Sequence, residues 1–242
     1  MDALYTAHRL REQAHWRQDE PLPVEAILPR YCQTAFVRVA GLSIERLAGW
    51  LRGRGILRPG CLTSCGDRAL RGAVVAWGGY GLLIAELSDD LAEQAYTFAH
   101  EAGHYLGDHL YPRLELAAAL GTSALEALDG LRPPTEAERF HAILRRRDLS
   151  RFTHLLARDD DGAAESVVEA EREADRFACE LLAPCSLVES HLYGARPDPD
   201  SLPRLVSLLR DELGLPPSAA ARYAHRFSLP ESGGLLTRLG IV

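Results

Sequence analysis

The sequence contains no lysine, so all 27 of its basic residues are arginine, which we attribute to compositional bias rather than to function. Its 34 acidic residues give a net charge of −7 at pH 7. A chain with this balance lacks the basic surface that direct nucleic-acid binding requires. The acidity is concentrated in residues 71–194, which carry 11 arginines and 22 acidic residues. A solvated acidic face is the favoured interpretation, and attraction of a basic partner is the alternative.

Long hydrophobic runs are also missing. The longest near-apolar stretch, Val74–Ala85, has 12 residues and is interrupted by Gly78-Gly79. A membrane-spanning helix needs about 20 apolar residues. Residues 1–20 contain no apolar core of the kind found in secretion signals. We therefore expect a cytoplasmic protein without a membrane segment.

Cysteine is scarce, and five copies are an odd number that does not suggest a disulfide framework. A reduced compartment fits this usage best. Cys61 and Cys65 form a C-x3-C pair, but no second pair accompanies them. We interpret them as buried or incidental rather than as a metal site.

Local patterns predict both strands and helices. Two apolar runs, Ala73–Trp77 and Tyr80–Leu87, flank Gly78-Gly79 and predict a β-hairpin. A helix should start after Ser88 and reach about His109, because Pro112 is expected to stop it. Apolar residues at helical spacing predict the other helices. These are expected at residues 1–20, 24–39, 44–54, over most of 113–160, and at 165–182, 202–213 and 218–227.

The strongest chemical pattern is His100-Glu101-Ala102-Gly103-His104. Because an α-helix has 3.6 residues per turn, His100 and His104 project from the same face and can bind one metal ion. Glu101 points about 100° away around the helix, where it can take a proton from a metal-activated water without binding the metal. The pattern therefore predicts a zinc site with Glu101 as general base.

A zinc site of this type needs a third protein ligand and one open position. Glu171 on a later predicted helix is the candidate, with Glu173 as the lesser one. Asp175 shares a face with Glu171 and is expected to accept the other ring N–H of a bound histidine. His109 lies five residues beyond His104, faces away from the site, and is interpreted as structural.

Two strings together resemble the ImmA/IrrE family of zinc metallo-endopeptidases. They are Ala99–His104 and the run from Glu171 to Pro184, which reads EREADRFACELLAP. The resemblance extends over about residues 42–227. It implies an α+β, zincin-like fold with a small sheet, a helix carrying the His-Glu-x-x-His motif and a second helix carrying the third ligand. It also implies zinc held by His100, His104 and Glu171, Glu101 as base, and helix-turn-helix repressor proteins as substrates.

We divide the chain accordingly into a helical extension (1–41), a zincin-like catalytic domain (42–194) and a C-terminal helical segment (195–242). Glu171 follows His104 by 67 positions, which exceeds what the resemblance leads us to expect. A helical insertion at 113–160 accounts for the excess and is a plausible gate to the site. Residues 1–41 show no convincing DNA-binding helix-turn-helix.

For two further roles the sequence offers alternatives. The strand Tyr80–Leu87 is either an edge strand that pairs with extended substrate or a purely structural strand. The residue that stabilises the oxyanion is one of four candidates. These candidates are His191, Tyr193, Tyr223 and His225.

The main hypothesis is a cytoplasmic zinc endopeptidase that cleaves a regulatory, DNA-binding protein. One rival is a regulatory module that keeps zinc but binds a partner without cutting it, and the presence of Glu101 argues against that reading. The other rival is a zinc hydrolase of a small amide. No membrane and no direct nucleic-acid partner are expected.

Overall fold

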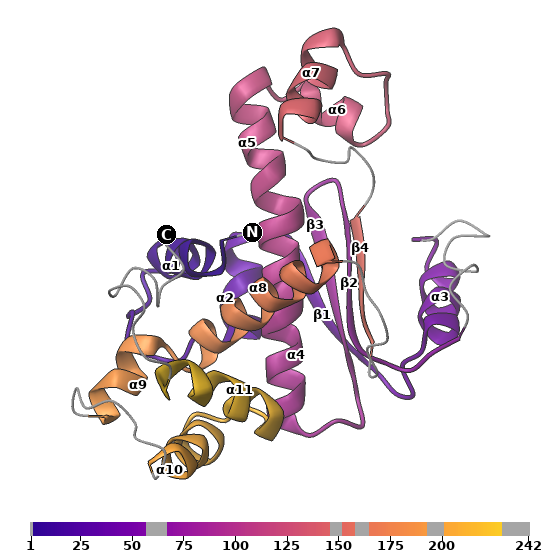
Figure 1. Ribbon diagram of the computed structural model, residues 1–242. Helices are drawn as coiled ribbons and strands as arrows, with labels where there is room; N and C mark the ends of the chain where they lie inside the picture. Colours follow the sequence, from indigo (N-terminus) through magenta and orange to yellow (C-terminus); the bar gives the residue numbers. More distant parts are fainter. Residues whose placement is uncertain (1, 57–66, 146–151, 158–164, 193–200, 229–242) are drawn as a thin grey trace.

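The computed structural model describes residues 2–56, 67–145, 152–157, 165–192 and 201–228. Its fold is α+β, as predicted, with a mixed four-stranded sheet covered by helices (Figure 1). The first half contains α1 (Ala3–Gln13), α2 (Val24–Tyr31), β1 (Thr34–Val39), α3 (Ile44–Gly53), β2 (Leu70–Trp77), β3 (Tyr80–Glu86) and α4 (Leu91–His104). The second half contains α5 (Tyr111–Leu120), α6 (Ala124–Leu128), α7 (Glu136–Arg145), β4 (Phe152–Ala157), α8 (Glu165–Leu182), α9 (Cys185–His191), α10 (Leu202–Ser207) and α11 (Pro217–Ser228). Two π-helical segments, Tyr105–Leu110 and Leu208–Glu212, complete the described elements.

The strands lie in the order β1-β3-β2-β4. β2 and β3 form the predicted hairpin, with Trp77 opposite Tyr80. Gly78 and Gly79 connect them with φ angles of 55° and 89°. Two successive positive φ angles suit a two-residue hairpin turn and favour glycine at both positions, so the sequence signal and the geometry agree.

The outer strands were not predicted. Residues 24–39 were expected to form one helix, but the helix ends at Tyr31 and Thr34–Val39 forms β1, parallel to β3. Likewise, among the described residues within 113–160, α5, α6 and α7 are helical as expected, but Phe152–Ala157 forms β4, antiparallel to β2. Both strands pair with segments far away in the sequence, and a local apolar pattern carries no information about such pairing.

The predicted stop at Pro112 is wrong. α4 continues through the π-helical segment Tyr105–Leu110 directly into α5, and the helical path ends only at Leu120 (Figure 1). Proline disrupts a helix because it lacks an N–H and clashes with the carbonyl four residues earlier. The wider π-helical turn before Pro112 shifts this carbonyl register, so that Pro112 stands in the first turn of α5.

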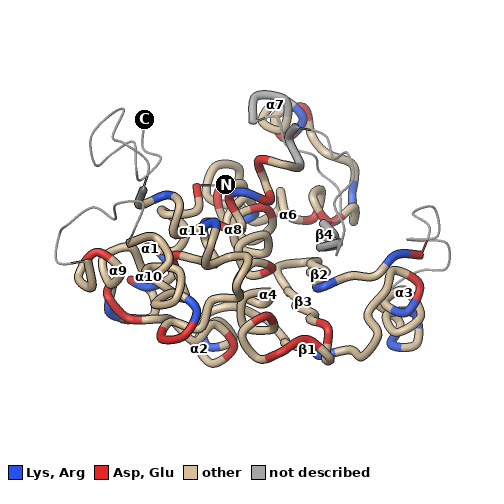
Figure 2. Tube along the Cα trace, turned by 60° about the horizontal axis from the view of Figure 1, so that its bottom comes forward, with Lys and Arg blue, Asp and Glu red and all other residues tan. Residues whose placement is uncertain are grey.

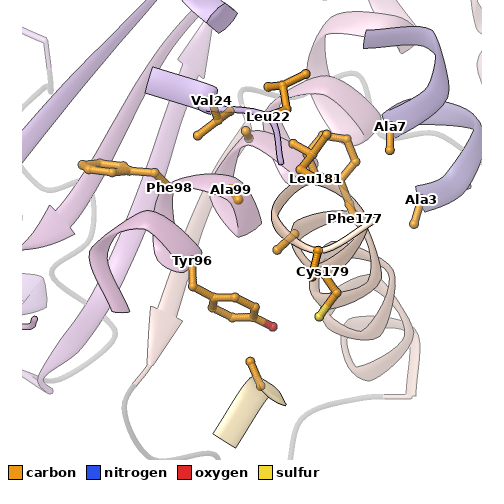
Figure 3. Close-up of a cluster of buried hydrophobic side chains, with 14 of the residues drawn as sticks. Ala3, Ala7, Leu22, Val24, Tyr96, Phe98, Ala99, Phe177, Cys179 and Leu181 are labelled. Carbon is orange, nitrogen blue, oxygen red and sulfur yellow. The ribbon is translucent and has the colours of Figure 1, made fainter. Parts of the chain in front are cut away.

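Two hydrophobic cores lie on opposite faces of the sheet. The smaller one packs Ile44, Leu47 and Leu51 of α3 against β2 and β3. The larger one joins the other face to α4, α8, α1 and the C-terminal helices. Figure 3 shows part of it, with Phe98 of α4 on one side and Phe177 of α8 between α4 and α1.

The N-terminal helix packs against α8 and is joined to it by a buried arginine. The Arg11 side chain is 1% exposed, and its guanidinium donates hydrogen bonds to the carbonyls of Arg17, Glu20, Glu180 and Leu181. These bonds fix α1 against the C-terminal end of the helix that carries Glu171. In the described residues, no helix is long and apolar enough to cross a membrane. Cys61 and Cys65 lie outside the described residues.

Candidate metal centre

α4 places the two histidines on one buried face. Asp90 caps the helix by accepting the Glu93 backbone N–H at 2.8 Å, so the helix begins at a defined residue. His100 and His104 lie one turn apart, with their ring centroids separated by 5.0 Å. Each is only 1% exposed. The helical spacing predicted from the sequence is therefore confirmed, and both imidazoles are shielded from water.

α8 brings Glu171 to the same point. Its carboxylate lies 3.2 Å from Nε2 of His100 and 3.8 Å from Nε2 of His104. One ligand atom from each of the three residues lies within 4.8 Å of the others. Two ligands about 2.1 Å from a tetrahedral ion lie about 3.4 Å apart, so the separations match one shared metal. The donor set, two imidazoles and one carboxylate, is also suitable for one shared metal ion.

Close packing of α4 against α8 makes this convergence possible. Gly103 stands between the two histidine-bearing turns, facing α8. A Cβ at this position would lie 3.0 Å from the Phe177 ring and 3.4 Å from the Ala174 Cα. The absence of a side chain at Gly103 therefore lets the two backbones approach closely enough for Glu171 to reach both imidazoles.

Each histidine also has a carboxylate at its other ring nitrogen. Nδ1 of His100 lies 3.1 Å from Asp175, as the sequence predicted, and Nδ1 of His104 lies 2.8 Å from Asp108. A carboxylate at Nδ1 fixes the tautomer that leaves Nε2 to bind a metal. Asp108 was missed, although its i, i+4 spacing from His104 was a usable signal. Its final position depends on the π-helical segment, which the sequence pattern did not reveal.

The electrostatics of the buried group favour a cation. Burial by itself would lower the pKa of His100, but hydrogen bonds with Asp175 and Glu171 outweigh it and raise that pKa to about 9. Burial would likewise raise the pKa of Asp175, yet its hydrogen bond with His100 keeps that pKa below the usual value. The carboxylates around His100 thus favour positive charge at this site, so a proton and a metal ion compete for it.

Glu101 occupies a different side of α4, facing the sheet. It is fully buried, and its Oε1 lies 3.2 Å from the position that a Cβ would take on Gly72 of β2. Glycine at position 72 therefore provides the room for this carboxylate beside the strand. His100 and His104 both lie within 4 Å of the Glu171 carboxylate, whereas the Oε1 of Glu101 lies beside β2.

The remaining sequence candidates lie elsewhere. Glu173 accepts the Ala3 backbone N–H at 2.9 Å and pairs with Arg176, so it holds α1 rather than a metal. His109 accepts the Gly79 backbone N–H at 3.3 Å, at the hairpin turn, which agrees with a structural role. Of the four oxyanion candidates, Tyr193 lies outside the described residues. His191 and His225 are exposed, whereas Tyr223 is buried, and nothing in their positions assigns the role to one of them.

Of the two alternatives for Tyr80–Leu87, the topology supports the purely structural strand and not the edge strand that pairs with substrate. β3 is an inner strand, with β1 on one side and β2 on the other, so its backbone is already paired. The parallel strand β1, which the sequence pattern did not predict, pairs with the side of β3 that would otherwise be an open edge. Within the described sheet, the outer strand next to β2 is β4, and its Leu156 is the register partner of Gly72 beside Glu101.

The centre thus consists of a buried His100, His104 and Glu171 group on two packed helices, with Glu101 next to it. Comparisons with protein-family models, with curated proteins and with solved structures find no match for this chain. Interpretation of the centre therefore rests on its residues and their geometry.

Proposed function

We propose that this protein is a zinc-dependent endopeptidase of the kind found in the ImmA/IrrE family. The observation that carries the proposal is the convergence of His100, His104 and Glu171, with Glu101 buried on the same helix and its Oε1 beside β2. Three protein ligands leave one position of a tetrahedral ion open, which is typical of catalytic rather than structural zinc sites. Imidazole and carboxylate ligands suit zinc, and among the described residues the metal-binding group includes no cysteine that would favour a closed structural site.

The chemistry of the site follows from the positions of its side chains. A bound zinc ion supplies Lewis acidity, which brings the pKa of water close to neutral. Glu101 accepts the proton of the attacking water and later passes it to the leaving amine. Asp175 and Asp108 hold the two imidazoles in the tautomer that presents Nε2 to the metal. β4 offers the outer edge nearest to Glu101, where an extended substrate backbone can add as a further strand.

We further propose that the substrate is a DNA-binding repressor in the cytoplasm. The support is the resemblance of the two motif strings, together with the acidity of residues 71–194, which attracts basic proteins. Figure 2 shows acidic and basic positions scattered among one another over the chain, so steering would be moderate and reduced by salt. α5, α6 and α7 extend beyond the end of α4 (Figure 1), and we propose that they restrict access to the site.

The test compares the wild-type protein with Glu101→Gln. Both should bind about one zinc per chain, measured by elemental analysis, because Glu101 is not a ligand. Only the wild type should cleave a repressor encoded beside this protein, and hydrolysis by Glu101→Gln should fall by about 10²- to 10⁴-fold, the contribution of a general base. Casein should remain largely intact, since access is restricted.

Other outcomes would favour the rival functions. Full zinc occupancy without hydrolysis of any tested protein or peptide would favour a binding module that does not cut its partner. Turnover of small amides alone would favour an amide hydrolase. Equal cleavage by Glu101→Gln and the wild type would exclude Glu101 as the base.

A further inference from the structure

We propose that a second site, a pocket formed by α8, α11 and α4, binds a small phosphate-bearing anion. The pocket has a volume of about 230 Å³ and lies behind the metal centre, on the far side of Asp175. We call it the arginine pocket. Its charged lining residues are Arg172, Asp175, Arg176, Arg222 and Arg226.

The residues that line the arginine pocket are predominantly positively charged. Four guanidinium groups and a single carboxylate line it, so the lining residues carry a net charge of +3 within an acidic protein. Arg172 and Arg176 are separated by one turn of α8, and Arg222 and Arg226 by one turn of α11. Like charges at this spacing destabilise a helix, and here two such pairs face one another. An anion between them would offset this repulsion.

The chemistry of the donors points to phosphate. A guanidinium group presents several N–H donors in a plane and forms paired hydrogen bonds with phosphate oxygens. Arg172 lies 3.6 Å from Glu169 and Arg222 lies 3.2 Å from Asp175. The two arginine side chains are 66% and 57% exposed, so a ligand can compete with these carboxylates for them. Arg176 pairs with Glu173, and the Arg226 guanidinium lies 5.7 Å from the Tyr223 ring centroid. These contacts hold the two side chains at the rim.

Size restricts the class of ligand. Pockets for drug-sized molecules usually measure about 300–1,000 Å³, so the arginine pocket suits a phosphate or diphosphate group rather than a larger molecule. Tyr96 closes its inner end, with the ring reaching from α4 toward α8 beside the Cys179 sulfur (Figure 3). The ligand class we infer is therefore inorganic phosphate, diphosphate or a small metabolite that carries one of these groups.

The arginine pocket shares one residue pair with the metal centre. Arg222 donates to Oδ2 of Asp175 at 3.2 Å, and Oδ1 of Asp175 faces Nδ1 of His100 at 3.1 Å. The Tyr96 hydroxyl also donates to Oδ1, at 2.6 Å. An anion that draws Arg222 away would leave Asp175 a stronger acceptor for His100 and would add negative charge near a bound cation. Anion and metal should therefore strengthen each other's binding, and this consequence rests on the proposed metal centre.

The direct test measures phosphate and diphosphate binding to the metal-free protein by titration calorimetry, which requires no peptidase activity. The double variant Arg172→Ala/Arg226→Ala removes two lining charges without touching the contact between Arg222 and Asp175. Its control, Arg204→Ala/Arg210→Ala, removes the same charge from exposed positions on and after α10. We expect saturable binding by the wild type and the control, and binding at least about tenfold weaker by the pocket variant.

Several results would overturn the proposal. No saturable binding to the metal-free wild type would do so, and so would equal binding by a folded pocket variant, with folding checked by circular dichroism. Tighter binding of a short single-stranded oligonucleotide than of diphosphate would replace the small-anion site with a nucleic-acid site. None of these results would contradict the proposed zinc peptidase activity.

A second measurement tests the link to the metal. Zinc affinity is measured against a chromophoric chelator, with and without phosphate. An increase that occurs in the wild type and the control but is lost in Arg172→Ala/Arg226→Ala supports coupling through the pocket. An increase of the same size in the pocket variant would show that phosphate acts directly at the zinc and would overturn the coupling.

Discussion

At the scale of single residues, carboxylates determine how the buried histidines are presented. Asp175 and Asp108 each face one Nδ1, and they come from different elements, α8 and the π-helical segment after α4. Both arrangements leave Nε2 directed toward Glu171. Metal affinity should therefore depend on two residues that do not touch the metal.

We expect Asp108→Ala and Asp175→Ala each to weaken zinc binding by about 10- to 100-fold, because the imidazole loses the acceptor that fixes its tautomer. Competition with a chromophoric chelator at neutral pH measures the effect. Asp211→Ala, which removes an exposed carboxylate paired with Arg210, should leave the affinity unchanged. If Asp108→Ala retained full affinity, the contact with His104 would have no role in binding the metal.

Glu86 illustrates a carboxylate with a structural role. Burial alone would raise its pKa, but hydrogen bonds from the Ser88, Leu42 and Gly41 backbone N–H groups and the Ser88 hydroxyl lower it to about 2, against an ordinary value of 4.5. A group with a lowered folded pKa stabilises the protein above its unfolded pKa. That stability is lost as the pH falls from about 4.5 toward about 2.

The metal-free variant Glu86→Gln should therefore be less stable than the wild type by about 2–3 kcal/mol at neutral pH. The difference should shrink steadily below about pH 4.5. Urea unfolding at a series of pH values measures it. A difference that stayed constant with pH would show that lost packing, rather than the lowered pKa, causes the destabilisation.

At the scale of elements, the site depends on how closely α4 and α8 approach. Gly103 makes this approach possible, since a Cβ there would lie 3.0 Å from the Phe177 ring. Phe177 is fully buried in the larger core and has little room to move. A larger side chain at position 103 should therefore push α8, and Glu171 with it, away from the histidines.

We expect Gly103→Val to destabilise the protein by about 1–3 kcal/mol, the usual cost of overpacking, and to reduce zinc binding. Gly49→Ala is the matched control, because nothing lies within 4 Å of a Cβ at this position inside α3. It should stabilise the protein by about 0.5–1 kcal/mol through helix propensity. Thermal unfolding and zinc titration measure both variants, and unchanged zinc affinity in Gly103→Val would contradict the packing argument.

At the scale of the whole molecule, the N-terminal segment is part of the support of the site. β1 completes the sheet beside β3, and Arg11 joins the end of α1 to four backbone carbonyls, two of them on α8. Because α8 also carries Glu171, removal of this segment should affect the metal centre as well as the fold.

Replacing Arg11 by Ala should destabilise the metal-free protein by about 3 kcal/mol or more, because buried carbonyl groups lose their donors and a cavity remains. Arg52→Ala, on the exposed face of α3, should change stability by less than about 0.5 kcal/mol. Urea denaturation compares the two. Equal stabilities would show that water replaces the guanidinium without cost.

The sequence by itself determined the features that depend on local geometry. The helical period puts His100 and His104 on one face of their helix. It puts Glu171 and Asp175 on one face of a second helix, and both placements are independent of the rest of the chain. The Gly78-Gly79 turn likewise specified the hairpin, because glycine tolerates its positive φ angles.

Only the tertiary structure decided how these local pieces meet. It placed β1 and β4 on the two sides of the hairpin, which decided between the two alternatives for Tyr80–Leu87 in favour of a structural inner strand. The helix continues past Pro112 through a π-helical segment, in which Asp108 contacts His104. Arg222 of α11 likewise contacts Asp175 of α8 only in the folded chain. The physical reason is that these outcomes depend on packing and pairing between residues far apart in the chain, for which spacing along the sequence provides no measure.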